Sequence, residues 1–178
     1  MPNWASCTLA VYGPTEAVQK FIEDNKGIEV GTDFGLADGE TRELPLSFER
    51  AIPTPDQSKF DGMDYMQTKD EPDYWYNFHV NSWGTKWNLG DETSLDVRDN
   101  GDGTSTAFYM FETAWAPPEA WLAHVAPNYP DLSMKLEYRE EGMGFAGLLG
   151  FHKGVEVENQ YWEQSFHTDV DQYGEMYG

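Results

Sequence analysis

The sequence has one cysteine, few basic residues and no long hydrophobic run. Because Cys7 stands alone, no disulfide can form within the chain, which is typical of proteins in a reducing compartment. The N-terminus lacks the basic flank and apolar core of a signal peptide. No apolar stretch approaches the roughly 20 residues that span a bilayer. We therefore expect a cytoplasmic protein that does not bind membranes.

Acidic residues greatly outnumber basic ones. The chain has 11 lysines and arginines against 32 aspartates and glutamates, which gives a formal net charge of −21. Direct binding to nucleic acid is disfavoured, because phosphate contacts need clustered lysine and arginine. A strongly negative surface attracts cations and basic proteins instead. The same charge also keeps a protein in solution without any partner, so it supports both a binding surface and a solvated acidic shell.

No motif of a catalytic or metal site stands out. The four histidines lack zinc-site spacing, and Asp96, Asp99 and Asp102 lack the ligand order of an EF-hand loop. Residues 142–147 match the letters of the dinucleotide fingerprint G-x-G-x-x-G, but that motif needs a helix after it, and Leu148–Phe151 looks extended. We therefore expect no catalytic residue, no metal and no cofactor, and a protein that is not an enzyme.

The stretch from Thr104 to Tyr138 predicts a strand, a helix and a strand. Thr104–Trp115 is β-branched and aromatic, which is typical of a buried strand. Two prolines end that strand, and from Glu119 the apolar residues recur on one helical face. Leu132–Tyr138 then alternates apolar with polar residues, as a half-buried strand does.

The remaining elements are shorter. Cys7–Tyr12 predicts a strand, after which Thr15 is placed to cap a helix that stops at Gly27. Prolines limit Leu44–Ile52 to a short edge strand or an extended loop. Three more segments read as strand: Glu92–Arg98, joined to Thr104 through an Asn100–Gly103 turn, then Gly142–Phe151 and Val155–Tyr161.

Together these elements predict a single α+β domain. Their order is that of a ferredoxin-like sandwich, a βαββαβ antiparallel sheet with both helices on one face, followed by a trailing hairpin. We assign residues 1–160 to this domain, with an insertion at about residues 28–90. Residues 161–178 read as an acidic, aromatic C-terminal tail.

Several short motifs carry a family resemblance. They are Met1-Pro2-Asn3-Trp4, Leu46-Ser47-Phe48, Ile52-Pro53-Thr54-Pro55, Trp83-Gly84-Thr85-Lys86-Trp87, Thr113-Ala114-Trp115-Ala116-Pro117-Pro118 and Gly142-Met143-Gly144-Phe145-Ala146-Gly147. With these motifs the chain resembles the YubB-type ferredoxin-like proteins carried by phages and plasmids. Ala5 and Cys7 depart from that pattern, which often has Cys and Asn near the start. The resemblance implies a ferredoxin-like fold and an origin in a mobile element, but no reaction.

One motif predicts a ligand pocket. Trp83-Gly-Thr-Lys-Trp87 places a cation between two aromatic residues, and Lys86 with Thr85 could contact an anionic group. Alternatively, both tryptophans anchor the insertion to the sheet while Lys86 rests on a ring or in water. The candidate ligand-binding residues are Trp83, Thr85, Lys86, Trp87, Trp115 and Phe145.

The acidic residues predict a partner-binding surface. Its candidate members are Asp61, Asp64, Asp70, Asp99, Asp102, Glu140, Glu141, Glu156 and Glu158. Gathered on one face, they would imitate a phosphate backbone and occupy a basic site on a host or defence protein. The first functional hypothesis is therefore a non-enzymatic, nucleic-acid-mimicking inhibitor. The alternative is a protein that binds or sequesters a small molecule or nucleotide in the aromatic pocket.

Overall fold

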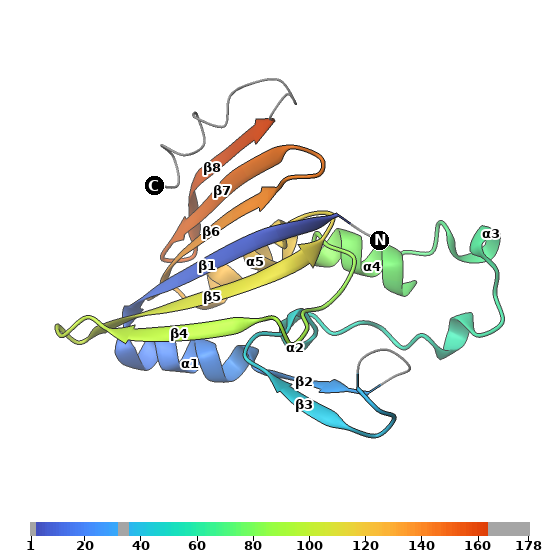
Figure 1. Ribbon diagram of the computed structural model, residues 1–178, viewed down its shortest axis with the longest axis horizontal. Helices are drawn as coiled ribbons and strands as arrows, with labels where there is room; N and C mark the ends of the chain where they lie inside the picture. The colour runs from blue at the N-terminus through green and yellow to red at the C-terminus, as the bar shows by residue number, and fades with distance from the viewer. Residues whose placement is uncertain (1–2, 32–35, 164–178) are drawn as a thin grey trace.

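The fold is built on a six-stranded antiparallel sheet with the strand order β4-β5-β1-β6-β7-β8 (Figure 1). The computed structural model describes residues 3–31 and 36–163. The strands of this sheet are β1 (Trp4–Pro14), β4 (Ser94–Asp99), β5 (Thr104–Ala114), β6 (Ser133–Glu140), β7 (Phe145–His152) and β8 (Val155–Glu163). With the helices α1 (Thr15–Asn25) and α5 (Glu119–Val125), the first four strands in space form the predicted βαββαβ unit. The hairpin β7–β8 follows, so the predicted fold class is confirmed.

Strict alternation along the strands gives the sheet one buried face. Leu9 on β1 lies opposite Tyr109 on β5 and Leu136 on β6, and all three are at most 1% exposed. Helices α1 and α5 cover this face and contribute Phe21 and Trp121 to the same core. Because side chains alternate with a period of two, the residues between these positions point to the other face of the sheet.

The ends of α1 differ from the prediction. Thr15 does not cap the helix, because its hydroxyl bonds to the Ser105 hydroxyl at 2.8 Å and so ties the helix start to β5. The helix ends where Lys26 turns extended, with φ −62° and ψ 146°, and Gly27 does not take a left-handed conformation. Glycine is needed there for space, since a Cβ atom would lie 2.3 Å from Cβ of Ser47.

The segment between α1 and β4 contains several short elements. They are the two-stranded sheet β2 (Gly27–Val30) and β3 (Thr41–Leu44), the helices α2 (Phe48–Ala51), α3 (Tyr65–Thr68) and α4 (Trp75–Ser82), and the one-turn helix η1 (Ser58–Phe60). The prediction of extended chain over Leu44–Ile52 is wrong for α2. A helical turn forms because it places Phe48 in the core, against the rings of Trp83, Phe111 and Trp121.

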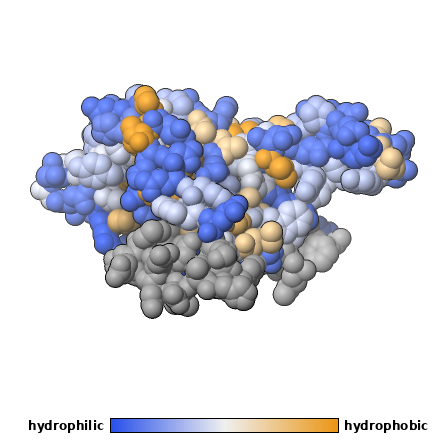
Figure 2. Space-filling model, turned by 90° about the horizontal axis from the view of Figure 1, so that it is seen from above, coloured by the Kyte–Doolittle hydropathy of each residue, from blue (hydrophilic) through white to orange (hydrophobic). Residues whose placement is uncertain are grey.

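An arm carrying η1 and α3 stands away from the sheet (Figure 1). In the view from above it projects from the body and is mainly hydrophilic (Figure 2). At the other end of the chain, residues 161–163 complete β8, and the rest of the predicted acidic tail lies outside the described residues. The one-turn helix η2 (Ala126–Asn128) continues α5. Within the described ranges, no helix is both long enough and apolar enough to cross a membrane.

Candidate functional site

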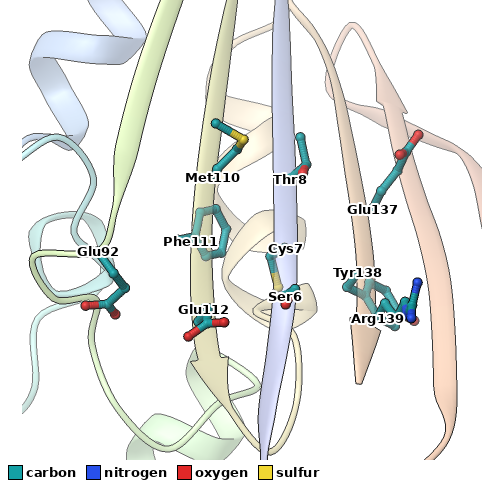
Figure 3. Close-up of a pocket in the computed structure, with 10 residues that line it drawn as sticks. All are labelled: Ser6, Cys7, Thr8, Glu92, Met110, Phe111, Glu112, Glu137, Tyr138 and Arg139. Carbon is teal, nitrogen blue, oxygen red and sulfur yellow. The ribbon is translucent and has the colours of Figure 1, made fainter. Parts of the chain in front are cut away.

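A hollow of about 650 Å³ lies on the face of the sheet opposite α1 and α5, which we call the exposed face (Figure 3). Residues on this face are accessible to solvent: Tyr12 is 46% and Met110 is 53% exposed. The hollow is lined by Ser6, Cys7, Thr8, Glu92, Met110, Phe111, Glu112, Glu137, Tyr138 and Arg139.

Two strands and one loop contribute the three carboxylates that line this hollow. Thr8 in the central strand β1 lies opposite Met110 on β5 and Glu137 on β6. Two residues along, Ser6 lies opposite Glu112 on β5 and Arg139 on β6. Since Ser6 and Thr8 are small, the floor between the flanking strands stays low, and the longer acidic side chains stand at its sides. Glu92, from the loop before β4, adds a third carboxylate (Figure 3).

The balance of charge around the hollow is negative. Glu137 pairs with Lys135 at 3.1 Å, and Arg139 pairs with Glu141 beside the hollow. Pairs of this exposure contribute about 0–1 kcal/mol, so they neutralise charge without fixing geometry. Counting these two, the ion pairs of the described residues engage eight of the 11 lysines and arginines with acids of the same chain. Little positive charge is left to offset the carboxylates.

The thiol beneath the hollow is not a nucleophile. Cys7 is buried, and its burial raises the pKa of the thiol to about 12. Its sulfur lies 3.6 Å from the Thr113 hydroxyl, inside the sheet. A thiol with so high a pKa stays protonated at neutral pH, and the thiolate is the reactive form. In the part of the chain that the structure describes, no three His, Cys, Asp or Glu side chains come together as a metal site requires.

The predicted aromatic pocket is divided by the structure. Trp83 is fully buried, its ring stacked on His79 and its indole N–H donating to the Ile52 carbonyl at 3.0 Å. Thr85 is 1% exposed and donates its hydroxyl to the Ala114 carbonyl. Neither residue can contact a ligand, so their assignment to a pocket is corrected: both anchor the insertion to the core.

The other four residues of that prediction remain accessible. The Lys86 ammonium lies over Trp87 and Trp115, 4.7 Å and 4.5 Å from the ring centroids. Trp87 is 38% and Trp115 is 43% exposed. Trp115 and Phe145 line a second hollow of about 600 Å³, at the end of β5 and the start of β7.

The nine predicted acidic residues do not form one face. Asp61, Asp64 and Asp70 lie on the arm, whereas Asp99 and Asp102 lie at the β4–β5 turn, at the far end of the molecule (Figure 1). Three others lie at or near the far edge of the sheet, Glu141 after β6 and Glu156 and Glu158 on β8.

Glu140 is the exception among them, because it is only 2% exposed. Its carboxylate accepts the backbone N–H groups of Gly142 at 2.7 Å and Met143 at 2.5 Å. Its assignment to the acidic surface is therefore corrected: it closes the β6–β7 turn.

Sequence reasoning did not find the hollow on the exposed face. Glu112 and Glu137 alternate with buried residues of two predicted strands, so their parity was a usable signal. Their place on either side of one hollow depends on both strands pairing with β1, which parity does not give. Glu92 lies before a strand and carries no periodic signal.

Fold and site together define an acidic ferredoxin-like α+β protein, and the comparisons with known proteins give its family. Residues 82–178 match the model of the ferredoxin-like domain in Api92-like proteins. The chain belongs to this Api92-like family. The crystal structure of Api92 from Yersinia pseudotuberculosis has a TM-score of 0.61 to this chain at 10% identity, covering 93% of this chain and 99% of the other. That likeness concerns the fold alone. No curated protein matches the sequence.

Proposed function

We propose that this chain is a non-enzymatic binding protein that holds a basic segment of a protein partner on its exposed face. The observation that carries the proposal is that Glu92, Glu112 and Glu137, from three separate parts of the chain, all line one hollow. Met110 between them offers apolar contact for the aliphatic stems of lysine or arginine. A net charge of −21 attracts such a segment from a distance.

We further propose that the chain comes from a mobile element and occupies a basic site on a host or defence protein. The resemblance to phage- and plasmid-borne proteins supports the origin, and the negative charge supports the kind of partner. A nucleic-acid-binding protein presents such a basic site, so a nucleic acid duplex would compete with this chain for it. The predicted acidic residues are scattered over the molecule. This favours binding through one hollow and disfavours imitation of a whole nucleic acid duplex.

The test is the affinity of a fluorescent oligoarginine peptide, measured by anisotropy at low and high salt. The triple variant Glu92→Gln, Glu112→Gln, Glu137→Gln should bind the peptide at least about tenfold more weakly than wild type, because each lost carboxylate removes a charged contact. The control Asp61→Asn, Asp70→Asn, Glu71→Gln removes the same charge from the exposed arm and should change affinity by less than about twofold. Equal losses in the two variants would mean that diffuse charge, not the hollow, binds the peptide.

A second measurement addresses the partner. Proteins captured from the host on the wild-type chain should be released by added DNA duplex and by salt. The triple variant should fail to capture those same proteins. Capture that persists in the triple variant would contradict the assignment of the exposed face.

A further inference from the structure

Trp115 has a strained backbone. Its φ is 70°, a left-handed value that is a genuine outlier for a bulky residue. The Ala116 N–H donates to the Ala114 carbonyl at 2.9 Å, two residues back, which makes Trp115 the centre of a γ-turn. The Trp115 N–H donates to the Asn3 carbonyl at 2.8 Å and holds the turn in place. Strain of this kind clusters at active sites and ligand-binding sites.

The γ-turn places the ring of Trp115 at the surface, 43% exposed, and so its burial does not offset the strain. Beside it lies the second hollow, whose remaining walls are Asn3, Met143, Phe145, Tyr161 and Glu163. Phe145 and Tyr161 are stacked across β7 and β8, with centroids 5.9 Å apart and planes at 29°. The hollow therefore combines three aromatic rings, a thioether and one carboxylate.

Trp115 already binds a cation of its own chain. The Lys86 ammonium lies 4.5 Å from the centroid of Trp115 and 4.7 Å from that of Trp87. A third ring, that of Tyr76, lies 6.0 Å from the same nitrogen. All three distances are within the range of cation–π attraction, which strengthens when the cation loses water. The rings at this end of the sheet are thus arranged to receive positive charge.

We propose that the second hollow binds a small organic cation, an alkylated ammonium or guanidinium group on a short apolar stem. The aromatic rings attract the charge, Met143 contacts the stem, and the Glu163 carboxylate is the counter-ion. An anionic ligand is disfavoured, because the charged residue in the lining of this hollow is the carboxylate of Glu163. The inference does not depend on the proposed function, since a free cation can occupy this hollow whether or not a basic segment lies on the exposed face.

Lys86 gives the proposal a distinctive consequence. Its ammonium occupies the face of Trp115 and repels a second cation near the hollow. The variant Lys86→Met keeps the length of the side chain and removes its charge, so it should tighten cation binding, by about threefold to tenfold. An anion-binding site would respond in the opposite direction, because the variant would remove its positive group.

The experiment compares choline with its neutral isostere, in which carbon replaces the quaternary nitrogen. Binding is followed by titration calorimetry and by the NMR signal of the Trp115 indole N–H. Choline should bind wild type at least about tenfold more tightly than the isostere, and Trp115→Leu and Glu163→Gln should each weaken it by about threefold or more. The control Tyr12→Leu, an exposed ring on the exposed face, should bind as wild type does.

Circular dichroism checks that each variant is folded. If Trp115→Leu does not fold, Glu163→Gln still tests the proposal. Equal binding of choline and the isostere would overturn the proposal, as would weaker choline binding by Lys86→Met. Loss of oligoarginine binding in the triple variant of the exposed face, with choline binding retained, would separate the two sites.

Discussion

The imidazole of His79 lies flat on the indole of Trp83, with ring centroids 3.8 Å apart and planes only 13° from parallel. The two ring nitrogens are both engaged: Nδ1 contacts the Lys86 carbonyl and Nε2 the Thr54 hydroxyl, each at 2.8 Å. His79 therefore joins α4 to the segment that follows it and to the loop after α2. Its half-buried position lowers the pKa of the imidazole, because burial disfavours the charged ring.

This arrangement predicts a pH dependence of stability. Because the folded-state pKa of His79 lies below the unfolded value of about 6.5, its neutral form contributes stability above that pH. That contribution is lost as the pH falls through the folded-state pKa. Urea unfolding should therefore show a steeper loss of stability on acidification for wild type than for His79→Gln. The variant of the exposed helix residue, His124→Gln, should follow wild type.

An NMR titration of His79 gives the decisive control. A pKa above about 6.5 would contradict the prediction. It would mean that the hydrogen bond to the Lys86 carbonyl and the negative charge of Glu49 stabilise the charged ring by more than burial disfavours it.

Glu140 predicts a stability difference between neighbouring carboxylates. In Glu140→Gln, one of the two N–H groups of the β6–β7 turn faces an amide that donates instead of accepting. A lost buried hydrogen bond of this kind costs about 1–3 kcal/mol in the free energy of unfolding. Glu141→Gln, one residue along and exposed, should cost less than about 1 kcal/mol. Equal effects, measured by urea unfolding, would contradict the structural role of Glu140.

Gly147 predicts a steric effect across two strands. Its partner on β6 is Tyr138, and a Cβ atom at position 147 would lie 2.1 Å from the Tyr138 hydroxyl oxygen. That hydroxyl donates to the Glu119 carboxylate of α5 at 2.8 Å, so the ring cannot move without breaking the link between sheet and helix. Gly147→Ala should destabilise the fold by about 1–3 kcal/mol.

The same position has its own controls. Gly150→Ala, on the same strand, should cost clearly less, because the nearest atom to the added Cβ is Cβ of Glu158 at 3.3 Å. Replacing Tyr138 by Leu in the Gly147→Ala background should recover part of the loss. A full additive loss in the double variant would mean that the contact with Tyr138 is not the cause.

The strands of the main sheet were predictable because alternation survives wherever one face is buried. The same rule, applied two residues beyond Tyr138, would have placed Glu140 in the core, since it shares the parity of Met134 and Leu136. Acidic character misled the prediction there, because the burial of Glu140 depends on two backbone N–H groups that only the turn brings near.

The short elements between α1 and β4 were less predictable. The strands β2 and β3 have four residues each and are mostly exposed, so they leave no clear period. In α2, tertiary packing of Phe48 overrides the local preference set by the flanking prolines. Composition could not distinguish the roles of Trp83 and Trp87. The path of the chain decides that the ring of Trp83 is buried and the ring of Trp87 is exposed.

The left-handed backbone at position 115 makes that position a test of the proposed cation site across the family. Glycine adopts this φ without strain, and asparagine or aspartate does so readily. A relative with one of these residues would fold more easily at the same bend but would lack the ring. Sorting relatives by this single position should therefore separate those that recognise positive charge at this end of the sheet from those that have lost that recognition.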